Sequence, residues 1–142
     1  RKGDYFLFKI AGEEIIVIRG EGDTVYAHYN VCRHRGSRVC LESEGHAKRL
    51  VCPYHAWSYR LDGTLANARA MPEGFDASQF GLKACQVRVF EGLIFVNLTP
   101  EGEQVPDFDE ITANLLPWIE RADLRNSKIL DHEAICRVRR CP

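Results

Sequence analysis

The stretch Cys32-Arg33-His34-Arg35-Gly36 and the stretch Cys52-Pro53-Tyr54-His55, separated from His34 by 17 residues, decide how this sequence is interpreted. Each offers one thiolate and one imidazole, and turn-forming residues lie beside or within both stretches. Two sulfur and two nitrogen donors suit zinc or an iron–sulfur centre far better than calcium or magnesium. The sequence therefore predicts a metal centre whose ligands are Cys32, His34, Cys52 and His55.

The mixing of Cys and His within each stretch separates the two candidate metals. Zinc ribbons and fingers pair Cys with Cys and His with His at short spacings. In a [2Fe–2S] centre of mixed ligation, two Cys bind one iron and two His bind the other. The spacings Cys-x-His and Cys-x-x-His favour this iron–sulfur centre, and a structural zinc site remains the alternative.

Neutral imidazoles make such a cluster less negative, and it is therefore easier to reduce. The added electron is expected on the His-ligated iron, so His34 and His55 form the expected exit edge. Their second ring nitrogens are free to bond a partner carboxylate or to lose a proton.

Residues between the ligands are expected to support the cluster. Backbone N–H groups around Arg35, Gly36, Ala56 and Trp57 are candidates for hydrogen bonds to cluster sulfur. The missing Cβ of Gly36 is expected to let the loop approach closely. Trp57 and Tyr59 either shield the cluster or pack in the core.

Length, composition and charge limit the function classes. With 142 residues and 45% hydrophobic content, the chain suits one globular domain with a proper core. A net charge of −1, with both signs interspersed, gives no basic footprint for nucleic acid. No apolar run approaches the roughly 18 residues that span a bilayer, so no membrane association is expected. Because the sequence begins on Arg1, we expect the natural chain to begin further upstream.

The remaining cysteines favour a reducing compartment. Beyond the two candidate ligands, the sequence contains Cys40, Cys85, Cys136 and Cys141. A core of this size needs no covalent staples, so these four are expected to be buried or free thiols, and a disulfide framework is the minority alternative. A cytoplasmic location is therefore expected.

The first hundred residues are typical of antiparallel β structure, because short β-branched or alternating runs are separated by Gly-containing turns. Residues 68–80 are predicted to form a surface loop, His28 to lie in a strand, and His46 to lie in a charged loop over 42–49. Neither histidine has a ligand-spaced companion. Strands are predicted at 5–10, 15–18, 25–29, 50–51, 58–60, 64–66, 83–90 and 93–98.

The composition shifts after Pro100. Residues 101–107 are acidic and contain Pro and Gly, which indicates a connector. Asp109 is predicted to cap a helix, and Pro117 to interrupt it, with one apolar stripe formed by Ile111, Leu115, Leu116 and Ile119. We therefore expect a domain over 1–100 and a connecting helical segment over 101–142.

The sequences CRHRG (32–36) and CPYHAWSY (52–59) resemble the Rieske family, and more narrowly the N-terminal domain of Rieske non-haem iron oxygenase α subunits. LDGTL (61–65) is similar to that subfamily as well. The resemblance implies an all-β fold, a Rieske-type antiparallel β sandwich with a cluster-binding subdomain of two loops, plus a short C-terminal helical segment. It also implies that Cys32 and Cys52 bind one iron and that His34 and His55 bind the other.

Sequence differences from the respiratory-complex Rieske proteins affect the expected reduction potential of the cluster. Those proteins have disulfide-forming cysteines where this chain has Ser37 and Tyr54, and a hydrogen-bonding Ser where it has Trp57. Without that disulfide and that serine hydrogen bond, the reduction potential of the cluster is expected to lie toward the low end of the Rieske range. A low-potential centre suits donation to an oxygen-activating iron.

The resemblance also implies partners. A ferredoxin or flavin reductase would supply the electron, which would pass to a mononuclear Fe(II) in a neighbouring subunit of a homotrimer. That site has two His and one carboxylate, but His132 is the only histidine after Leu98, so the catalytic domain is expected to be missing. The chain alone would transfer electrons without hydroxylating or demethylating any substrate.

The main alternative function is a stand-alone Rieske-type ferredoxin. Such carriers usually end soon after the last hairpin, whereas this chain continues, which favours the oxygenase interpretation. The sequence leaves the substrate open, since aromatic rings and quaternary amines are both compatible.

Overall fold

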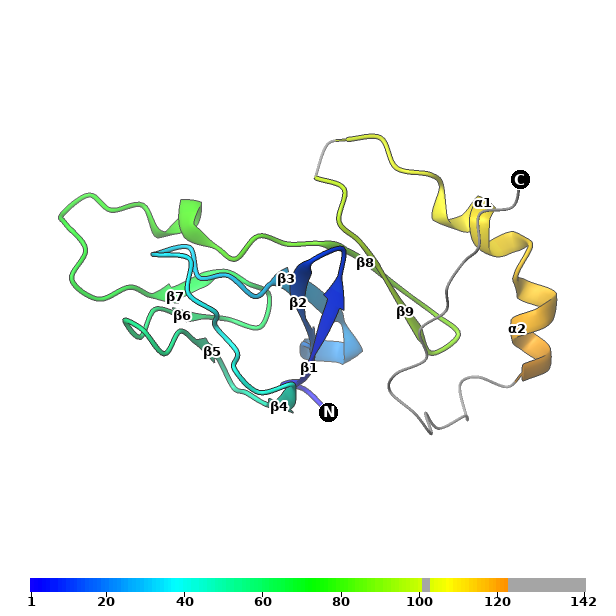
Figure 1. Cartoon of the computed structure of the whole chain (residues 1–142), viewed down its shortest axis with the longest axis horizontal. Coiled ribbons are helices and arrows are strands. Elements are labelled where there is room, and N and C mark those ends of the chain that lie inside the picture. Colours follow the sequence, from blue (N-terminus) through cyan, green and yellow to red (C-terminus); the bar gives the residue numbers. More distant parts are fainter. Residues whose placement is uncertain (101–102, 123–142) are drawn as a thin grey trace. The chain divides into compact units, whose positions relative to one another are not determined.

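The computed structural model of the chain describes residues 1–100 and 103–122. Paired strands in its two larger sheets run antiparallel, and a hairpin follows them (Figure 1). The first sheet has the order β3-β2-β1-β4, from Val25–Tyr29, Glu13–Arg19, Asp4–Ile10 and Glu44–His46. The second has the order β5-β6-β7, from Leu50–Val51, Ser58–Tyr59 and Leu65–Asn67. The hairpin consists of β8 (Gln86–Phe90) and β9 (Leu93–Asn97).

Strand β2 lies at the centre of the core. This position explains why its apolar residues form an unbroken run. Ile16 and Ile18 pack on one face with Leu50 and Tyr59 of the second sheet. Ile15 and Val17 pack on the other face, against side chains that include Val87, Val96 and Leu98 of the hairpin segment. A strand covered on both faces needs a continuous hydrophobic run, so the predicted buried strand is confirmed.

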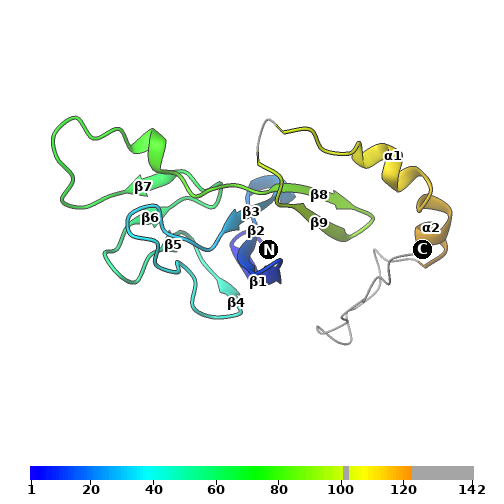
Figure 2. The ribbon, with the colours of Figure 1, turned by 45° about the horizontal axis from the view of Figure 1, so that its top comes forward.

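The two Cys/His stretches lie in loops that connect strands of the two sheets. The first follows β3, and the second joins β5 to β6. The segment between β3 and β4 lies beside β5 and β6 in both views (Figure 1, Figure 2). The sheets thus bring together two loops that are far apart in the sequence, as loops on a rigid scaffold often are at functional sites.

Strand β4 was not predicted, because residues 42–49 have the composition of a charged loop. Glu44–His46 nevertheless pairs with β1, and His46 is opposite Asp4. The His46 Nδ1 lies 2.8 Å from the Asp4 carboxylate. All three residues of β4 are exposed, and charged residues are common on edge strands, so the sequence lacks the hydrophobic alternation that signals a strand.

The predicted surface loop over 68–80 is only partly exposed. Met71, Phe75 and Phe80 pack against the main core, and the rings of Phe75 and Phe80 each lie 5.8 Å from that of Trp57. A short 3₁₀ helix, Ala77–Phe80, is capped by the Asp76 side chain. Aromatic residues spaced without a regular period give no strand or helix signal, although they fill the core.

In the sequence of the hairpin, Val87 and Val89 alternate with Gln86 and Arg88, which predicts one buried face for both valines. Val87 packs in the core, as expected, but Val89 is 54% exposed.

The C-terminal segment forms two short helices, α1 (Phe108–Ala113) and α2 (Leu116–Ala122). Pro117 lies in the first turn of α2, which confirms the predicted interruption. The capping residue is Asp107, whose side chain accepts from the Asp109 N–H, so the assignment of Asp109 as the cap was wrong. The apolar stripe is only partly buried: Leu116 and Ile119 are half-buried, whereas Ile111 and Leu115 are exposed by 51% and 40%.

The described residues divide into two compact units, one over residues 1–89, 94–100 and 103–105, and the other over residues 90–93 and 106–122. The second unit includes an edge-to-face contact of Phe90 with Phe108. Within the described residues, no helix has the length and apolar character to cross a membrane. Cys136, Cys141 and His132 lie outside the described residues.

Candidate metal centre

The first loop is closed by two backbone hydrogen bonds around Cys32. The Cys32 N–H donates to the Ser37 carbonyl at 2.8 Å, and the Gly36 N–H donates to the Cys32 carbonyl at 3.0 Å. Gly36 has a φ of 71°, in the left-handed region that favours glycine. These bonds fold residues 32–37 into a compact turn that presents Cys32 and His34 from one short segment.

The second loop repeats this turn. The Cys52 N–H donates to the Trp57 carbonyl at 2.8 Å, and the Ala56 N–H donates to the Cys52 carbonyl at 3.0 Å. Ala56 takes the place of Gly36 and has a φ of 58°. The histidine comes two residues after the cysteine in the first loop and three residues after it in the second.

The backbone amides of Gly36 and Ala56, which are predicted candidates for hydrogen bonds to cluster sulfur, take part in these turns. Gly36 donates to the Cys32 carbonyl, and Ala56 donates to the Cys52 carbonyl. Among the described residues, a Cβ on Gly36 would meet nothing within 4 Å, so the feature of this structure that favours glycine here is the left-handed backbone. Direct cluster contacts of Arg35, Gly36 and Trp57 remain predictions.

The two thiols lie inside the protein. Cys32 and Cys52 are each 2% exposed, and the two side chains interact with each other. Burial raises the pKa of Cys32, and hydrogen bonds from the Tyr59 hydroxyl and the His34 backbone oppose that shift. Sulfur donors held side by side in a dry site are suited to a metal, which binds the thiolate.

Tyr59 bonds directly to one of these sulfurs. Its hydroxyl lies 3.1 Å from the Cys32 Sγ and accepts from the Arg33 N–H at 3.0 Å. Burial raises the pKa of Tyr59 far above neutrality, so the hydroxyl keeps its proton and can donate to a thiolate. From the sequence, only shielding or core packing is expected of Tyr59, and the contact with Cys32 is not predicted.

The two imidazoles form a second pair. The rings of His34 and His55 lie 4.6 Å apart, edge to face, and both are half-buried. The His34 Nδ1 is buried and has no hydrogen-bond partner within the described residues. Burial lowers the pKa of His34, and the neighbouring His55 and Arg35 lower it further, which favours the neutral imidazole that binds metals.

Trp57 packs directly on this pair. Its ring stacks on His34 at 4.8 Å with an interplanar angle of 10°, and it is 2% exposed. Phe75 and Phe80 contact its other edges. Trp57 therefore belongs to the core and also holds the orientation of a candidate ligand.

A buried asparagine anchors the first loop. The Asn30 Oδ1 accepts from the N–H groups of Val39 and Cys40, and its Nδ2 donates to the Cys40 carbonyl and to Glu14. Arg38 also binds the Glu14 carboxylate with two nitrogens. The only sign of this network in the sequence is a polar residue between a predicted strand and the first ligand.

The donors fit a two-iron cluster. They form a buried sulfur pair and a half-buried imidazole pair, with one orphaned ring nitrogen. No three His, Cys, Asp or Glu side chains within residues 1–100 and 103–122 gather as a site for one metal ion. A mixed-ligand [2Fe–2S] cluster uses sulfur on one iron and imidazole on the other. The other described cysteines, Cys40 and Cys85, are buried free thiols, and burial raises the pKa of each to about 11.

Curated relatives align with most of this chain at about two-fifths sequence identity. The glycine betaine monooxygenase oxygenase subunit of Pseudomonas aeruginosa is 42% identical over 129 residues, which cover 90% of this chain and 29% of the relative. The carnitine monooxygenase oxygenase subunit of Escherichia coli K12 is 40% identical over 107 residues, which cover 73% of this chain and 28% of the relative. The chain thus spans less than a third of the length of these relatives.

Solved structures share the fold. The apo form of a quaternary ammonium Rieske monooxygenase superposes with a TM-score of 0.76 and 32% identity, covering 92% of this chain and 38% of that one. Naphthalene 1,2-dioxygenase from Rhodococcus sp. gives a TM-score of 0.76 and 29% identity, covering 86% and 28%. Residues 1–91 match the family described as Rieske [2Fe-2S] domain. With its paired sulfurs and imidazoles on two matching loops, this chain belongs to the Rieske [2Fe–2S] domain family.

Proposed function

We propose that this chain holds a [2Fe–2S] cluster through Cys32, Cys52, His34 and His55 and transfers single electrons within an oxygenase terminal component. The observation that carries this proposal is the pairing of two buried thiols with two half-buried imidazoles on matching loops. When bound, such a cluster accepts and releases one electron at a time. Residues 1–100 form the cluster domain in this proposal, and residues 101–142 lead toward a catalytic domain.

The residues around the proposed cluster have different roles. The Tyr59 hydroxyl lies 3.1 Å from the Cys32 sulfur and would donate to the thiolate, and hydrogen bonds to ligand sulfurs tune the reduction potential of iron–sulfur centres. Trp57 fixes the His34 ring and excludes water from one side. The half-buried imidazoles form the edge through which the electron passes. Two loops on a rigid scaffold thus keep the sulfur side dry and the nitrogen side accessible.

The full-length protein would use these electrons for oxygenation. A ferredoxin or flavin reductase supplies them, and a mononuclear Fe(II) in a neighbouring subunit of a homotrimer receives them. The names of the relatives at 40–42% identity support a quaternary amine, such as glycine betaine or carnitine, as the substrate. The described chain alone is inactive in this proposal, and the whole protein works in the cytoplasm.

Redox titration of the cluster-loaded chain tests electron transfer. The expected result is one reversible one-electron reduction. In the Tyr59→Phe variant, losing one hydrogen bond of about 1 kcal/mol lowers the midpoint potential by roughly 40 mV. Tyr29→Phe, which removes a tyrosine from the other face of the first sheet, is the matched control and leaves the potential unchanged. A chain that binds iron and sulfide without any reversible reduction would contradict the proposal.

Turnover by the full-length oxygenase tests the substrate class. With a reducing partner and O2, consumption of glycine betaine or carnitine is expected, and naphthalene is expected to be inert. The 142-residue chain under the same conditions should be reduced without consuming substrate. Oxidation of naphthalene but neither amine would contradict the substrate assignment alone.

A further inference from the structure

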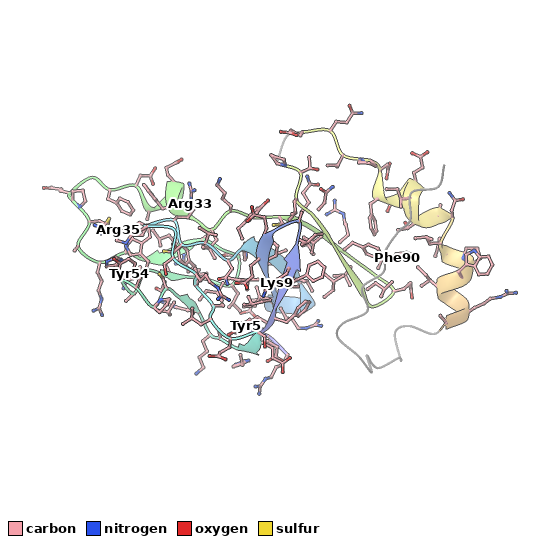
Figure 3. All side chains as sticks on the ribbon, in the orientation of Figure 1. Tyr5, Lys9, Arg33, Arg35, Tyr54 and Phe90 are labelled. Carbon is pink, nitrogen blue, oxygen red and sulfur yellow. The ribbon has the colours of Figure 1, made fainter. Side chains whose placement is uncertain are left out.

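A cavity of about 290 Å³ lies in the first unit, and none of the four candidate metal ligands lines it. Four segments surround it: the residues before β1, the β2–β3 connection with the start of β3, the β4–β5 connection, and the β6–β7 turn. Figure 3 shows Tyr5, near the start of β1, well away from Arg33, Arg35 and Tyr54 on the ligand loops. The cavity is therefore a feature of the fold separate from the metal centre.

The side chains that line this cavity carry an excess of positive charge. Four are cationic and two are anionic, which leaves two positive charges in a chain whose net charge is −1. Both carboxylates already have partners within the fold. Glu21 pairs with Lys2, and the Asp62 carboxylate accepts from the Thr64 N–H at 2.9 Å and from the Thr64 hydroxyl at 2.7 Å. The four cationic residues are Lys2, Lys48, Arg49 and Arg60.

Lys48 and Arg49 account for the excess. Both are exposed, and neither side chain has an ion pair or hydrogen bond within residues 1–100 and 103–122. Arg60 differs, because it donates to the Thr64 hydroxyl at 3.3 Å and interacts electrostatically with Asp62. Two adjacent positive charges repel each other, and an anion bound between them relieves that repulsion. The β4–β5 connection thus offers two available cations to an anionic ligand.

Backbone hydrogen bonds fix the walls of the cavity before any ligand binds. The Ala47 N–H donates to the Gly3 carbonyl at 2.9 Å, which ties the segment that carries Lys48 to the one that carries Lys2. The Gly3 N–H donates in turn to the Arg19 carbonyl at 2.7 Å, at the end of β2. Because three of the four segments are joined in this way, a ligand would have little backbone to order on binding.

An aromatic ring supplies the apolar wall. Tyr26 is half-buried, lines the cavity, and stacks on His28 with ring centroids 6.1 Å apart. A Cβ on Gly20 would lie 2.3 Å from the Tyr26 ring, so the glycine leaves the space that this ring occupies. Apolar walls with a few placed charged groups are typical of sites for small molecules. The expected ligand therefore has an anionic group and an apolar body.

We propose that this cavity binds a small phosphate ester, with its phosphate on Lys48 and Arg49 and its organic part against Tyr26. The forked N–H groups of arginine match phosphate oxygens, and lysine adds a point charge. A phosphate monoester carries about two negative charges at neutral pH, which equals the excess in the cavity. A zwitterion such as glycine betaine would bring its own cation against Lys48 and Arg49. The site thus goes beyond electron transfer and differs from a substrate site for quaternary amines.

Calorimetric titration of the cluster-loaded chain at pH 7.5 and low ionic strength tests the ligand class. The probe is phenyl phosphate, and benzoate is the matched ligand, with one ring and a single negative charge. We expect one-to-one binding of phenyl phosphate that is about tenfold tighter than that of benzoate. Equal affinities would show a general attraction for anions and would overturn the site. Tighter binding of succinate, a dicarboxylate, would overturn the phosphate class.

Charge-neutralising variants locate the binding. Lys48→Gln and Arg49→Gln should each weaken phenyl phosphate binding about fivefold. Lys83→Gln and Arg69→Gln remove the same charges at exposed positions outside the cavity and should leave it unchanged. Equal losses in all four variants would show an effect of net charge alone and would overturn the site. The thermal midpoint without ligand checks folding, and its rise with phenyl phosphate gives a second measure of affinity.

Two comparisons separate this site from the other proposals. The full-length oxygenase should bind phenyl phosphate with a similar affinity, and loss of binding there would mean that the rest of the protein covers the cavity, which would overturn the site. A chain without reversible reduction contradicts the proposed function alone. A reducible chain that does not distinguish phenyl phosphate from benzoate contradicts the phosphate site alone.

Discussion

The two ligand loops share a backbone turn but are held by different chemistry. Each turn is closed by the same two hydrogen bonds around its cysteine. The first loop is tied to the sheet by polar groups, through Asn30 and the pair of Glu14 with Arg38. The second is held by packing, through Trp57 among aromatic rings. One ligand geometry can thus be obtained with hydrogen bonds in one segment and with apolar contacts in the other.

The difference also explains the residues at the left-handed position. Gly36 adopts its positive φ without a Cβ penalty, whereas Ala56 bears one. Trp57 follows Ala56 directly and is 2% exposed, so the packing of the second loop compensates a conformation that alanine disfavours. Substitutions that act on one loop at a time can test this division.

The largest effect is expected from the ligands themselves. His34→Ala or His55→Ala removes one imidazole from a site that needs both, so each should abolish the mixed-ligand cluster, whichever loop is changed. The measurement is iron and acid-labile sulfide per chain. His46→Ala, outside both loops, is the control and should retain both. A full iron and sulfide content in either loop variant would remove that histidine from the ligand set.

Truncation of the tryptophan should break the second loop. Trp57→Ala leaves a cavity beside Phe75 and Phe80, and large aromatic truncations cost about 3–5 kcal/mol of unfolding free energy. Trp57→Phe keeps most of the packing and loses only an indole N–H that has no partner within the described residues, so it should cost about 1 kcal/mol. Denaturant unfolding measures both. Equal losses would show that the N–H, rather than packing, holds the loop.

Removal of the asparagine should break the first loop. Asn30→Ala leaves the amides of Val39 and Cys40 without their acceptor, and the expected loss is about 3 kcal/mol of unfolding free energy. Asn67→Ala, at an exposed position, should change it by less than about 0.5 kcal/mol. Hydrogen exchange of the Val39 and Cys40 amides locates the effect. Unchanged protection of both would contradict the anchoring role.

The buried His28, which contacts the turn after the second loop, should make the stability of the fold depend on pH. The buried His28 lies 3.0 Å from the Leu61 carbonyl through Nε2, and burial lowers its pKa below the ordinary value. The unfolded chain binds a proton near pH 6.5 and the folded chain does not, so stability falls as the pH drops below about 6.5.

The His28→Gln variant isolates this contribution, because glutamine keeps an N–H donor and does not titrate. Between about pH 7.5 and pH 5, its thermal midpoint should fall less than that of the unmodified chain. His46→Gln, at an exposed position, serves as the comparison. Parallel pH profiles for the unmodified chain and His28→Gln would rule out this origin.

The smallest effects are expected at the left-handed positions. Gly36→Ala should cost about 1 kcal/mol, because no atom of the described part of the chain outside its immediate neighbours lies within 4 Å of the added Cβ, and the cost comes from the left-handed backbone. Ala56→Gly should be neutral or stabilising by up to about 1 kcal/mol, because it relieves that strain. Ala66→Gly in β7 is the control and should destabilise. If Ala56→Gly destabilises as much as Ala66→Gly, the Ala56 backbone is not strained.

Much of the fold could be predicted because the informative residues are local. The run of β-branched residues at 15–18 predicts the central strand, and β3 and β5 have their predicted bounds. Strand β4 could not be predicted, since its charged residues gain their place only by pairing with β1. The cap at Asp107 differs from the predicted Asp109 because two nearby carboxylates offer the same signal.

The candidate ligands could be identified by residue type and spacing alone, but their surroundings could not. The hydroxyl of Tyr59 reaches Cys32 across 27 positions of sequence, and Asn30 gathers partners from two segments. Such contacts depend on how the sheets bring the loops together. Local sequence patterns do not encode that arrangement.

The most direct test of the central claim is nitrogen hyperfine spectroscopy of the reduced, cluster-loaded chain, combined with iron and sulfide analysis. Two irons, two acid-labile sulfides and couplings from two imidazole nitrogens are expected, since His34 and His55 both bind one iron. Each coupling should disappear with its own histidine. Bound zinc without sulfide, or an iron–sulfur cluster without nitrogen coupling, would contradict the claim.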